Sequence, residues 1–175
     1  MANIRDREDF TVCEVKKRLD YNPDSGAFTW KAKTKRHAGV SWPGDVAGTI
    51  KSETGYMFLG LWGFQYRAHR LAFLMMTGEW PRDEVDHING NRADNRWCNL
   101  RSATRPQNGR NTAIGTSNKS GCKGVSFRKD TSKWHARIVV DGKTILLGNF
   151  SLIEDAISAR KTAEMKYHGI FARSA

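Results

Sequence analysis

The chain has 175 residues, which is enough for one ordinary domain or two small ones. Its formal net charge of +11 at pH 7 and its sequence pI of about 9.9 favour a polyanionic partner, and nucleic acid first. The composition argues against a membrane protein, a secreted protein and a zinc ribbon: no apolar run approaches the ~20 residues of a membrane span, the N-terminus is polar, and the three cysteines form no CxxC pair. We therefore expect an intracellular protein that does not bind membranes.

Residues 1–66 are expected to form a small accessory unit that mixes helix and strand. Thr11 and Glu14 make a capping box, and the apolar spacing behind it predicts a first helix over 12–20. A turn composition follows at 22–26.

Short strands with glycine punctuation follow that turn. They are predicted over 27–31, 45–50, 56–62 and 64–67. Between the first two lies the basic run KAKTKRH at 31–37. Two interpretations of this run stay open: a solvated loop, and a segment that contacts phosphates.

A buried helix is predicted over 69–76, where apolar residues dominate and Gly78 ends the run. His69 and Arg70 are its polar exceptions. Arg70 either contacts phosphate or braces the neighbouring chain, and bracing is slightly favoured. The role of His69 stays open.

The densest group of polar side chains follows at 85–111, VDHINGNRADNRWCNLRSATRPQNGRN. Asp86 and His87 end a strand predicted over 84–88, and Asn89-Gly90 supplies a turn. A carboxylate is a hard oxygen ligand that suits Mg²⁺ or Mn²⁺, and a histidine beside it can take a proton from water near neutral pH.

A second strand over 99–103 and a helix opening at Thr104 complete this region. Thr104 and Gln107 have capping-box spacing, and Asn108 lies on the same helix. A strand, a loop, a strand and a helix would bring Asp86, His87 and Asn108 around one point.

This stretch resembles the HNH endonuclease family, in the branch found in phages and in intron-encoded homing nucleases. The likeness runs from HRL at His69 through DH, GN, NL and QN to Asn111. It implies a ββα-metal finger that hydrolyses DNA phosphodiesters with one divalent cation, Mg²⁺ or Mn²⁺. The residue roles that it implies are His87 as the general base, Asp86 and Asn108 as metal ligands, and Asn99 as the brace that orients the histidine.

Because His87 must be neutral to accept a proton, activity should fall at acidic pH. Arginines flank the site at irregular spacing, so only some can face the DNA. We expect phosphate contacts from Arg70, Arg101 and Arg105.

Residues 113–121 have the small, polar composition of a linker, and a second unit follows over 122–173. Alternating residues predict strands over 124–130, 134–140 and 144–147, with a hairpin turn at Asp141-Gly142. Ser151 and Glu154 have capping-box spacing before a helix predicted over 152–168. Trp134 alternates with apolar residues and is expected to pack against that helix.

The second unit resembles the DNA-binding domain of plant ethylene-response factors, the APETALA-two superfamily. The likeness rests on GV at Gly124, KW at Lys133, LGNF at Leu147 and an alanine-rich helix ending in YHG. It implies that the outward face of the sheet reads DNA. The matching outward positions are Lys123, Ser126, Arg128, Arg137, Thr144 and Leu146. Ser126, Val139 and Leu146 depart from the residues that the plant proteins carry on this face.

These features predict an α+β chain: an accessory unit (1–66), a nuclease finger (67–112), a linker (113–121) and a sheet module (122–173). The predicted function is metal-dependent, site-specific cleavage of double-stranded DNA by a monomeric homing-type enzyme of a phage or mobile element, acting in the host cytoplasm. Two alternatives stay open. One is a DNA-binding regulator with an inactive nuclease domain, and the other is a protein that binds or cleaves RNA.

Overall fold

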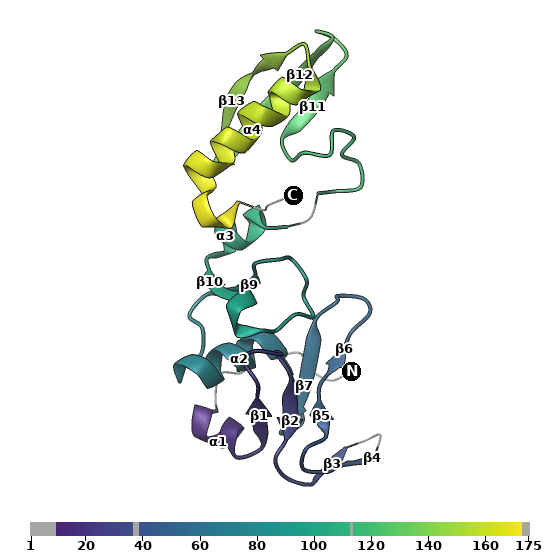
Figure 1. Cartoon of the computed structure of the whole chain (residues 1–175), viewed down its shortest axis with the longest axis vertical. Helices are drawn as coiled ribbons and strands as arrows, with labels where there is room; N and C mark the ends of the chain where they lie inside the picture. Colours follow the sequence, from purple (N-terminus) through teal and green to yellow (C-terminus); the bar gives the residue numbers. More distant parts are fainter. Residues whose placement is uncertain (1–9, 37–38, 113, 173–175) are drawn as a thin grey trace. The chain divides into compact units, whose positions relative to one another are not determined.

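The computed structural model describes residues 10–36, 39–112 and 114–172. The chain divides into two compact units, Met1–Thr104 and Arg105–Ala175 (Figure 1). Both combine helices with antiparallel strands, so the predicted α+β class is confirmed. No helix among the described residues is long and apolar enough to cross a membrane.

The first unit is built from short strands around one long helix. Its helices are α1 (Val12–Lys16), α2 (Ala68–Thr77) and the 3₁₀ turn η1 (Trp97–Asn99). Its strands are β1 (Leu19–Tyr21), β2 (Phe28–Trp30), β3 (Thr34–Arg36), β4 (Gly39–Ser41), β5 (Val46–Ala47), β6 (Thr49–Ile50), β7 (Met57–Leu61), β8 (Phe64–Arg67), β9 (Glu84–His87) and β10 (Leu100–Ala103). They pair as β1-β2-β5, β3-β4, β6-β7-β8 and β9-β10.

Two predicted elements of this unit are shorter than expected. The Thr11–Glu14 capping box is confirmed, but α1 ends at Lys16 instead of residue 20. The reason is that β1 pairs with β2, which requires an extended backbone from Leu19. The predicted strand over 45–50 is two strands, because Gly48 between them has a φ of 107° and breaks the extended run.

Helix α2 and the surrounding strands share a single apolar core. Leu71, Leu74 and Tyr66 are buried in it. Val85 of β9 and Leu100 of β10 belong to the same cluster, so the strands that carry the polar 85–111 region are anchored in this core. The predicted domain boundary at residue 66 therefore falls inside a continuous core, and the domain limits stay a prediction.

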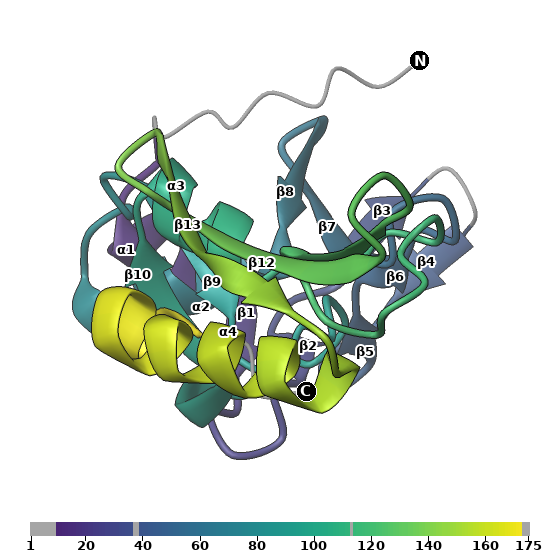
Figure 2. The ribbon, with the colours of Figure 1, turned by 90° about the horizontal axis from the view of Figure 1, so that it is seen from above.

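The second unit is a three-stranded antiparallel sheet with one helix along a face. Its elements are α3 (Arg105–Arg110), β11 (Val125–Arg128), β12 (Lys133–Val140), β13 (Lys143–Phe150), α4 (Ile153–His168) and the 3₁₀ turn η2 (Gly169–Phe171). The strand order is β11-β12-β13, and α4 lies along one face of the sheet (Figure 2). The predicted sheet and packed helix are confirmed.

Turn and cap predictions differ in outcome here. The hairpin at Asp141-Gly142 is confirmed: φ is 49° and 77°, as the tight turn between two twisted strands requires. The capping box of Ser151 and Glu154 is wrong, because β13 extends to Phe150 and Leu152 is the extended N-cap residue, with no side-chain cap. Trp134 is half-buried and packs against the small core beneath α4, as expected.

One turn of the first unit touches the loop that precedes η1. In the 22–26 turn, Gly26 has a φ of 72°, and its amide donates to the carbonyl of Asn22. A Cβ at Gly26 would lie 2.5 Å from the backbone N of Arg96 and 2.6 Å from the carbonyl carbon of Asn95. The turn and this loop are thus in backbone contact, which only glycine permits.

We expect Gly26→Ala to destabilise the first unit by about 2–4 kcal/mol, because left-handed strain adds to a clash with backbone that cannot move aside. Gly63→Ala is the matched control: φ is 80°, but nothing lies within 4 Å of the place that its Cβ would take, so only the strain remains. Urea unfolding of both variants measures the difference. Equal losses would contradict the importance of the backbone contact.

Candidate active site

Asp86 and His87 end strand β9, and both side chains are buried, with exposed fractions of 4% each. Successive residues of a strand point to opposite faces, so the two side chains meet different neighbours. Pairing with β10 sets Arg101 opposite Asp86 and Leu100 opposite His87. Adjacent positions in the sequence therefore have separate environments in the fold.

Asp86 is held by a guanidinium. Arg101 donates to the same carboxylate oxygen, Oδ2, from Nε at 2.8 Å and from Nη2 at 2.6 Å. Burying an unpaired carboxylate would be costly, and the pair with Arg101 offsets part of that cost. The predicted ligand Asp86 and the predicted phosphate contact Arg101 thus lie against each other.

His87 is oriented by Asn95, which is 2% exposed. The His87 Nε2 lies 3.4 Å from Asn95 Oδ1, and the Asn95 amide nitrogen donates to the carbonyl of Ala93 at 3.0 Å. Since the amide presents its oxygen to the ring, we assign the proton to Nε2, which leaves the lone pair on Nδ1. Burial lowers the pKa of His87, although the Asn95 bond and Asp86 oppose this, so the imidazole is neutral at pH 7.

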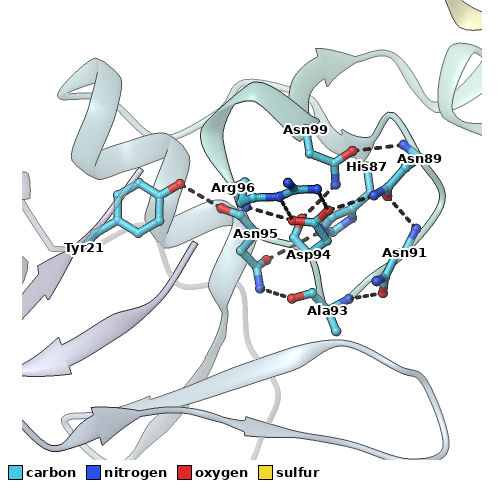
Figure 3. Close-up of polar contacts among 9 residues, drawn as sticks. All are labelled: Tyr21, His87, Asn89, Asn91, Ala93, Asp94, Asn95, Arg96 and Asn99. Atoms are coloured by element: carbon cyan, nitrogen blue, oxygen red, sulfur yellow. Dashed lines mark hydrogen bonds and ion pairs between the residues drawn. The ribbon is translucent and has the colours of Figure 1, made fainter. Parts of the chain in front are cut away.

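Asn99 closes the loop that carries Asn95 (Figure 3). Its Oδ1 accepts from the backbone N of Asn89 at 3.0 Å, and its Nδ2 donates to the carbonyl of Asp94 at 2.8 Å. Asn99 therefore binds the loop near both of its ends, at Asn89 and at Asp94. Through this loop it positions Asn95, which contacts His87. Its role as a brace stays a prediction.

Asp94 fastens the same loop from the other side. Its carboxylate accepts from the Arg96 guanidinium at 2.6 and 2.8 Å and from Asn89 Nδ2 at 2.7 Å. The Arg96 hydrogen bond, helped by the others, lowers the pKa of Asp94 to about 2. The ion pair between Asp94 and Arg96 therefore persists at neutral and mildly acidic pH.

Sequence reasoning missed Asn95. The accessory region also holds it, because Tyr21 Oη donates to the Asn95 carbonyl at 2.7 Å (Figure 3). Asparagine in a turn-rich stretch is usually solvated, so its residue type did not mark it. The one signal was its place beside Asp94 and ahead of an apolar Trp97, within the polar 85–111 region.

Asn108 lies on α3, in the second compact unit. Its convergence with Asp86 on one cation stays a prediction. Among the described residues, no three His, Cys, Asp or Glu side chains gather as a metal site. The predicted ligand pair is not a cluster of this type, because it combines the Asp86 carboxylate with the Asn108 amide. Both groups offer hard oxygen donors, which suit Mg²⁺ or Mn²⁺.

Two predicted phosphate contacts have different surroundings. Arg70 donates to the carbonyls of Asp83 at 3.1 Å and Pro81 at 3.3 Å, so it braces the segment that leads into β9. Arg105 is exposed at the start of α3. Contact of either residue with DNA stays a prediction.

The predicted positions of the second unit lie mostly on the sheet face opposite α4. Exposed side chains occupy it at Ser126, Arg128, Arg137 and Thr144, and Leu146 is 56% exposed there. Lys123 differs, since its Nζ donates to the carbonyl of Arg110 and to Thr112 Oγ1, both at 3.0 Å. Lys123 therefore ties α3 to the start of the sheet.

Comparisons with known proteins bear on the same region. Residues 66–110 match the family model described as HNH endonuclease, which spans β9, β10 and α3. Protein 3.8 of Escherichia phage T7 is 34% identical over 108 residues, which cover 61% of this chain and 88% of that protein. No solved structure matches the chain.

The buried imidazoles make stability depend on pH. His69 and His87 both have lowered pKa values in the folded chain, so the unfolded chain binds protons first as the pH falls below about 6.5. We expect full stability above that pH and a loss below it, of no more than about 1.4 kcal/mol per pH unit for each imidazole. Urea unfolding at pH 7.5, 6.5 and 5.5 measures this.

The comparison variant is His69→Phe, which removes one of the two groups. Its stability should fall less steeply between pH 6.5 and 5.5 than that of the parent. A parent whose stability is constant or rises over this range would show that the imidazoles are not neutral in the fold.

Proposed function

The chain belongs to the HNH endonucleases, a family of DNA phosphodiester hydrolases, and on that premise we propose that it is a metal-dependent, site-specific endonuclease of the homing type. Its substrate would be double-stranded DNA. We propose that it acts as a monomer in the host of a phage or mobile element, in line with its likeness to a phage protein.

The proposed base is His87. Its buried, neutral ring carries the lone pair on Nδ1, with Nε2 turned to Asn95 Oδ1. From that nitrogen His87 would take a proton from the attacking water, and Asn95 would keep the ring from turning as it becomes charged. This oriented neutral imidazole is the observation that carries the proposal.

Asp86 and Asn108 are the proposed ligands of one Mg²⁺ or Mn²⁺. When bound, the cation would supply Lewis-acid stabilisation of charge on the scissile phosphate and on the leaving 3′ oxygen. Asp86 suits this role because its carboxylate is a hard oxygen donor at the end of β9, beside the proposed base. Asn99 would hold the loop shape on which the base depends, and Arg70, Arg101 and Arg105 are the proposed phosphate contacts.

One observation favours a second function, that of a DNA-binding regulator with an inactive nuclease domain. Arg101 already neutralises Asp86, and a carboxylate committed to an internal ion pair is a poorer cation ligand. The two functions differ in one measurable respect. The regulator would bind DNA and leave its strands intact when Mg²⁺ or Mn²⁺ is added.

The C-terminal sheet is the proposed reader of sequence, in the manner of the ethylene-response-factor domain. Supporting this, its outward face carries exposed Ser126, Arg128, Arg137 and Thr144. Arginine can pair with guanine, and serine and threonine can bond phosphates or bases. A nuclease finger that contacts few bases selects its target weakly. A linked module that binds a specific sequence would raise the local concentration of the finger at that sequence.

We expect His87→Ala to reduce cleavage of duplex DNA about 10²- to 10⁴-fold while DNA binding stays near the parent level, because the change removes only the proton acceptor. The assay follows nicking and linearisation of host or phage DNA with Mg²⁺ or Mn²⁺, with a chelator arm that should abolish both. An RNA of the same sequence should stay intact.

His168→Gln is the matched histidine control. His168 lies in the second unit, where its Nε2 contacts the Val139 carbonyl at 3.1 Å, and glutamine keeps a group that can do this. This variant should cut DNA like the parent. If His87→Ala also cuts like the parent, the assignment of His87 as the base is wrong. If the parent binds DNA and never cuts it, the protein is a DNA-binding regulator.

For the sheet face, we expect Arg137→Ala to weaken duplex binding and, if the contact is to phosphate, to reduce the slope of log K against log salt by about 1. Lys161→Ala is the control, since it removes the same charge from exposed α4, which covers the opposite face. Fluorescence anisotropy at several salt concentrations measures both. Equal effects would indicate a nonspecific charge contribution and no reading face.

A further inference from the structure

A pocket of about 760 Å³ lies within the second unit, where α3, the start of β11, the hairpin between β12 and β13, and α4 meet. The described residues that line it include four cations, Arg110, Lys123, Arg137 and Arg160, and one carboxylate, Asp141. Its volume falls in the range of roughly 300–1,000 Å³ that is usual for ligand sites. A concave surface with this surplus of positive charge concentrates anions.

Two basic side chains of the pocket are accounted for by the fold itself. Strand β11 pairs with β12 only over residues 133–136, so the edge of β12 beyond them has no partner from β11. The Arg137 carbonyl on that edge accepts from Arg160 Nη1 at 3.1 Å. The Val139 carbonyl accepts from His168 Nε2, also at 3.1 Å. Arg160 and His168 therefore replace the missing strand, and Arg110, Lys123 and Arg137 are left to face a ligand.

The guanidinium of Arg110 is largely buried and weakly compensated. The Arg110 side chain is 18% exposed, and its Nη2 lies 3.5 Å from Oδ1 of Asp141, a side chain that is 89% exposed. A charge-assisted hydrogen bond is shorter, at roughly 2.7–2.9 Å, and a carboxylate in water is a weak partner. A second cation lies close by, because Lys123 Nζ donates to the Arg110 carbonyl at 3.0 Å. An anion that enters the pocket would therefore compensate Arg110 better than Asp141 does.

Arg137 supplies a second guanidinium, from the β12 wall of the same pocket. Its side chain is exposed and has no ion-pair partner among the described residues, whereas Arg160 is paired with Glu164 at 2.8 Å. The neighbouring histidine reports the resulting field: burial lowers the pKa of His168, and Arg110 and Arg160 lower it as well. The pocket is thus a region of positive potential.

We propose that this pocket binds a phosphate of the DNA backbone on Arg110, with Arg137 as a second donor, and that Asp141 is the counter-ion which the phosphate displaces. A phosphodiester offers two unesterified oxygens that match the planar donors of a guanidinium. The inference rests on the DNA binding proposed for this unit, and it does not depend on cleavage. It extends the DNA-binding surface from the sheet to α3, through a residue outside the predicted phosphate contacts.

A double-mutant cycle tests the displacement. Asp141→Asn removes the competing charge and keeps the hairpin, because asparagine readily adopts the positive φ of 49° at this turn position. We expect this variant to tighten the binding of duplex DNA about 2- to 5-fold, the scale of an exposed ion pair. Arg110→Gln should weaken binding about 10-fold and reduce the slope of log K against log salt by about 1. In the double variant the gain from Asp141→Asn should vanish, because no guanidinium remains for the carboxylate to occupy.

Asp130→Asn is the matched control. Asp130 is 65% exposed and its Oδ2 lies 3.8 Å from Arg128 Nη1, so this variant removes the same charge from another exposed ion pair. Its effect on binding should be equal with and without Arg110→Gln. Fluorescence anisotropy of the full chain with labelled duplex DNA, without a divalent cation and at several salt concentrations, measures every variant, and urea unfolding checks that each one folds.

Arg110→Lys provides a second test that does not remove the charge. Asp141→Asn should tighten binding again in that background, since lysine can pair with the carboxylate. If Asp141→Asn tightens binding equally in the presence and absence of a cation at position 110, only net charge matters and the phosphate site is overturned. Parent-like binding by Arg110→Gln would also overturn it. A parent that binds DNA and never cuts it would defeat the proposed cleavage, and the cycle would still decide the phosphate site.

Discussion

The candidate site depends on one constraint: a loop with almost no secondary structure must hold a buried imidazole in a fixed orientation. Side chains hold the loop over residues 89–95. Asn99 pairs with the Asn89 amide and the Asp94 carbonyl, and the Asp94 carboxylate accepts from the Asn89 side chain. Asn95 is the member of this network that reaches His87. The orientation of the His87 imidazole therefore depends on the hydrogen bonds that hold Asn95 and its loop.

The carboxylates near His87 are likewise held by paired side chains. Asp86 has Arg101, and Asp94 has Arg96, so each of these two carboxylates near His87 is compensated by its own guanidinium. Burial is the largest influence on the pKa of His87 and lowers it. Two carboxylates, each paired with a guanidinium, can in this way lie close to a buried imidazole.

Sequence patterns identified the parts of the fold that local chemistry determines. Alternation and turn residues predicted the hairpin at Asp141-Gly142. Glycine and apolar spacing predicted α2, which ends at Thr77 with Gly78 as its left-handed C-cap. Patterns failed where partners lie far along the chain. The shortened α1 reflects pairing of β1 with β2, and the absent Ser151 cap reflects extension of β13.

The candidate site divides in the same way. Asp86, His87 and Asn99 stand at motif positions, so their residue types and spacing were visible in the sequence. Asn95 and Tyr21 were not, because their contact joins residues 74 apart and its meaning exists only in the folded chain. His69 could be noticed in the sequence, but its burial against His87 could not.

The contact of the 22–26 turn with this loop has a consequence for how such enzymes diversify. Gly26 packs on the Asn95–Arg96 peptide, and the Trp97 amide donates to the Pro23 carbonyl at 2.8 Å. A recombination event that moved only residues 66–110 into another gene would leave those backbone groups behind. A fragment that keeps this loop in its present surroundings must therefore include the 22–26 turn, upstream of the matched residues 66–110.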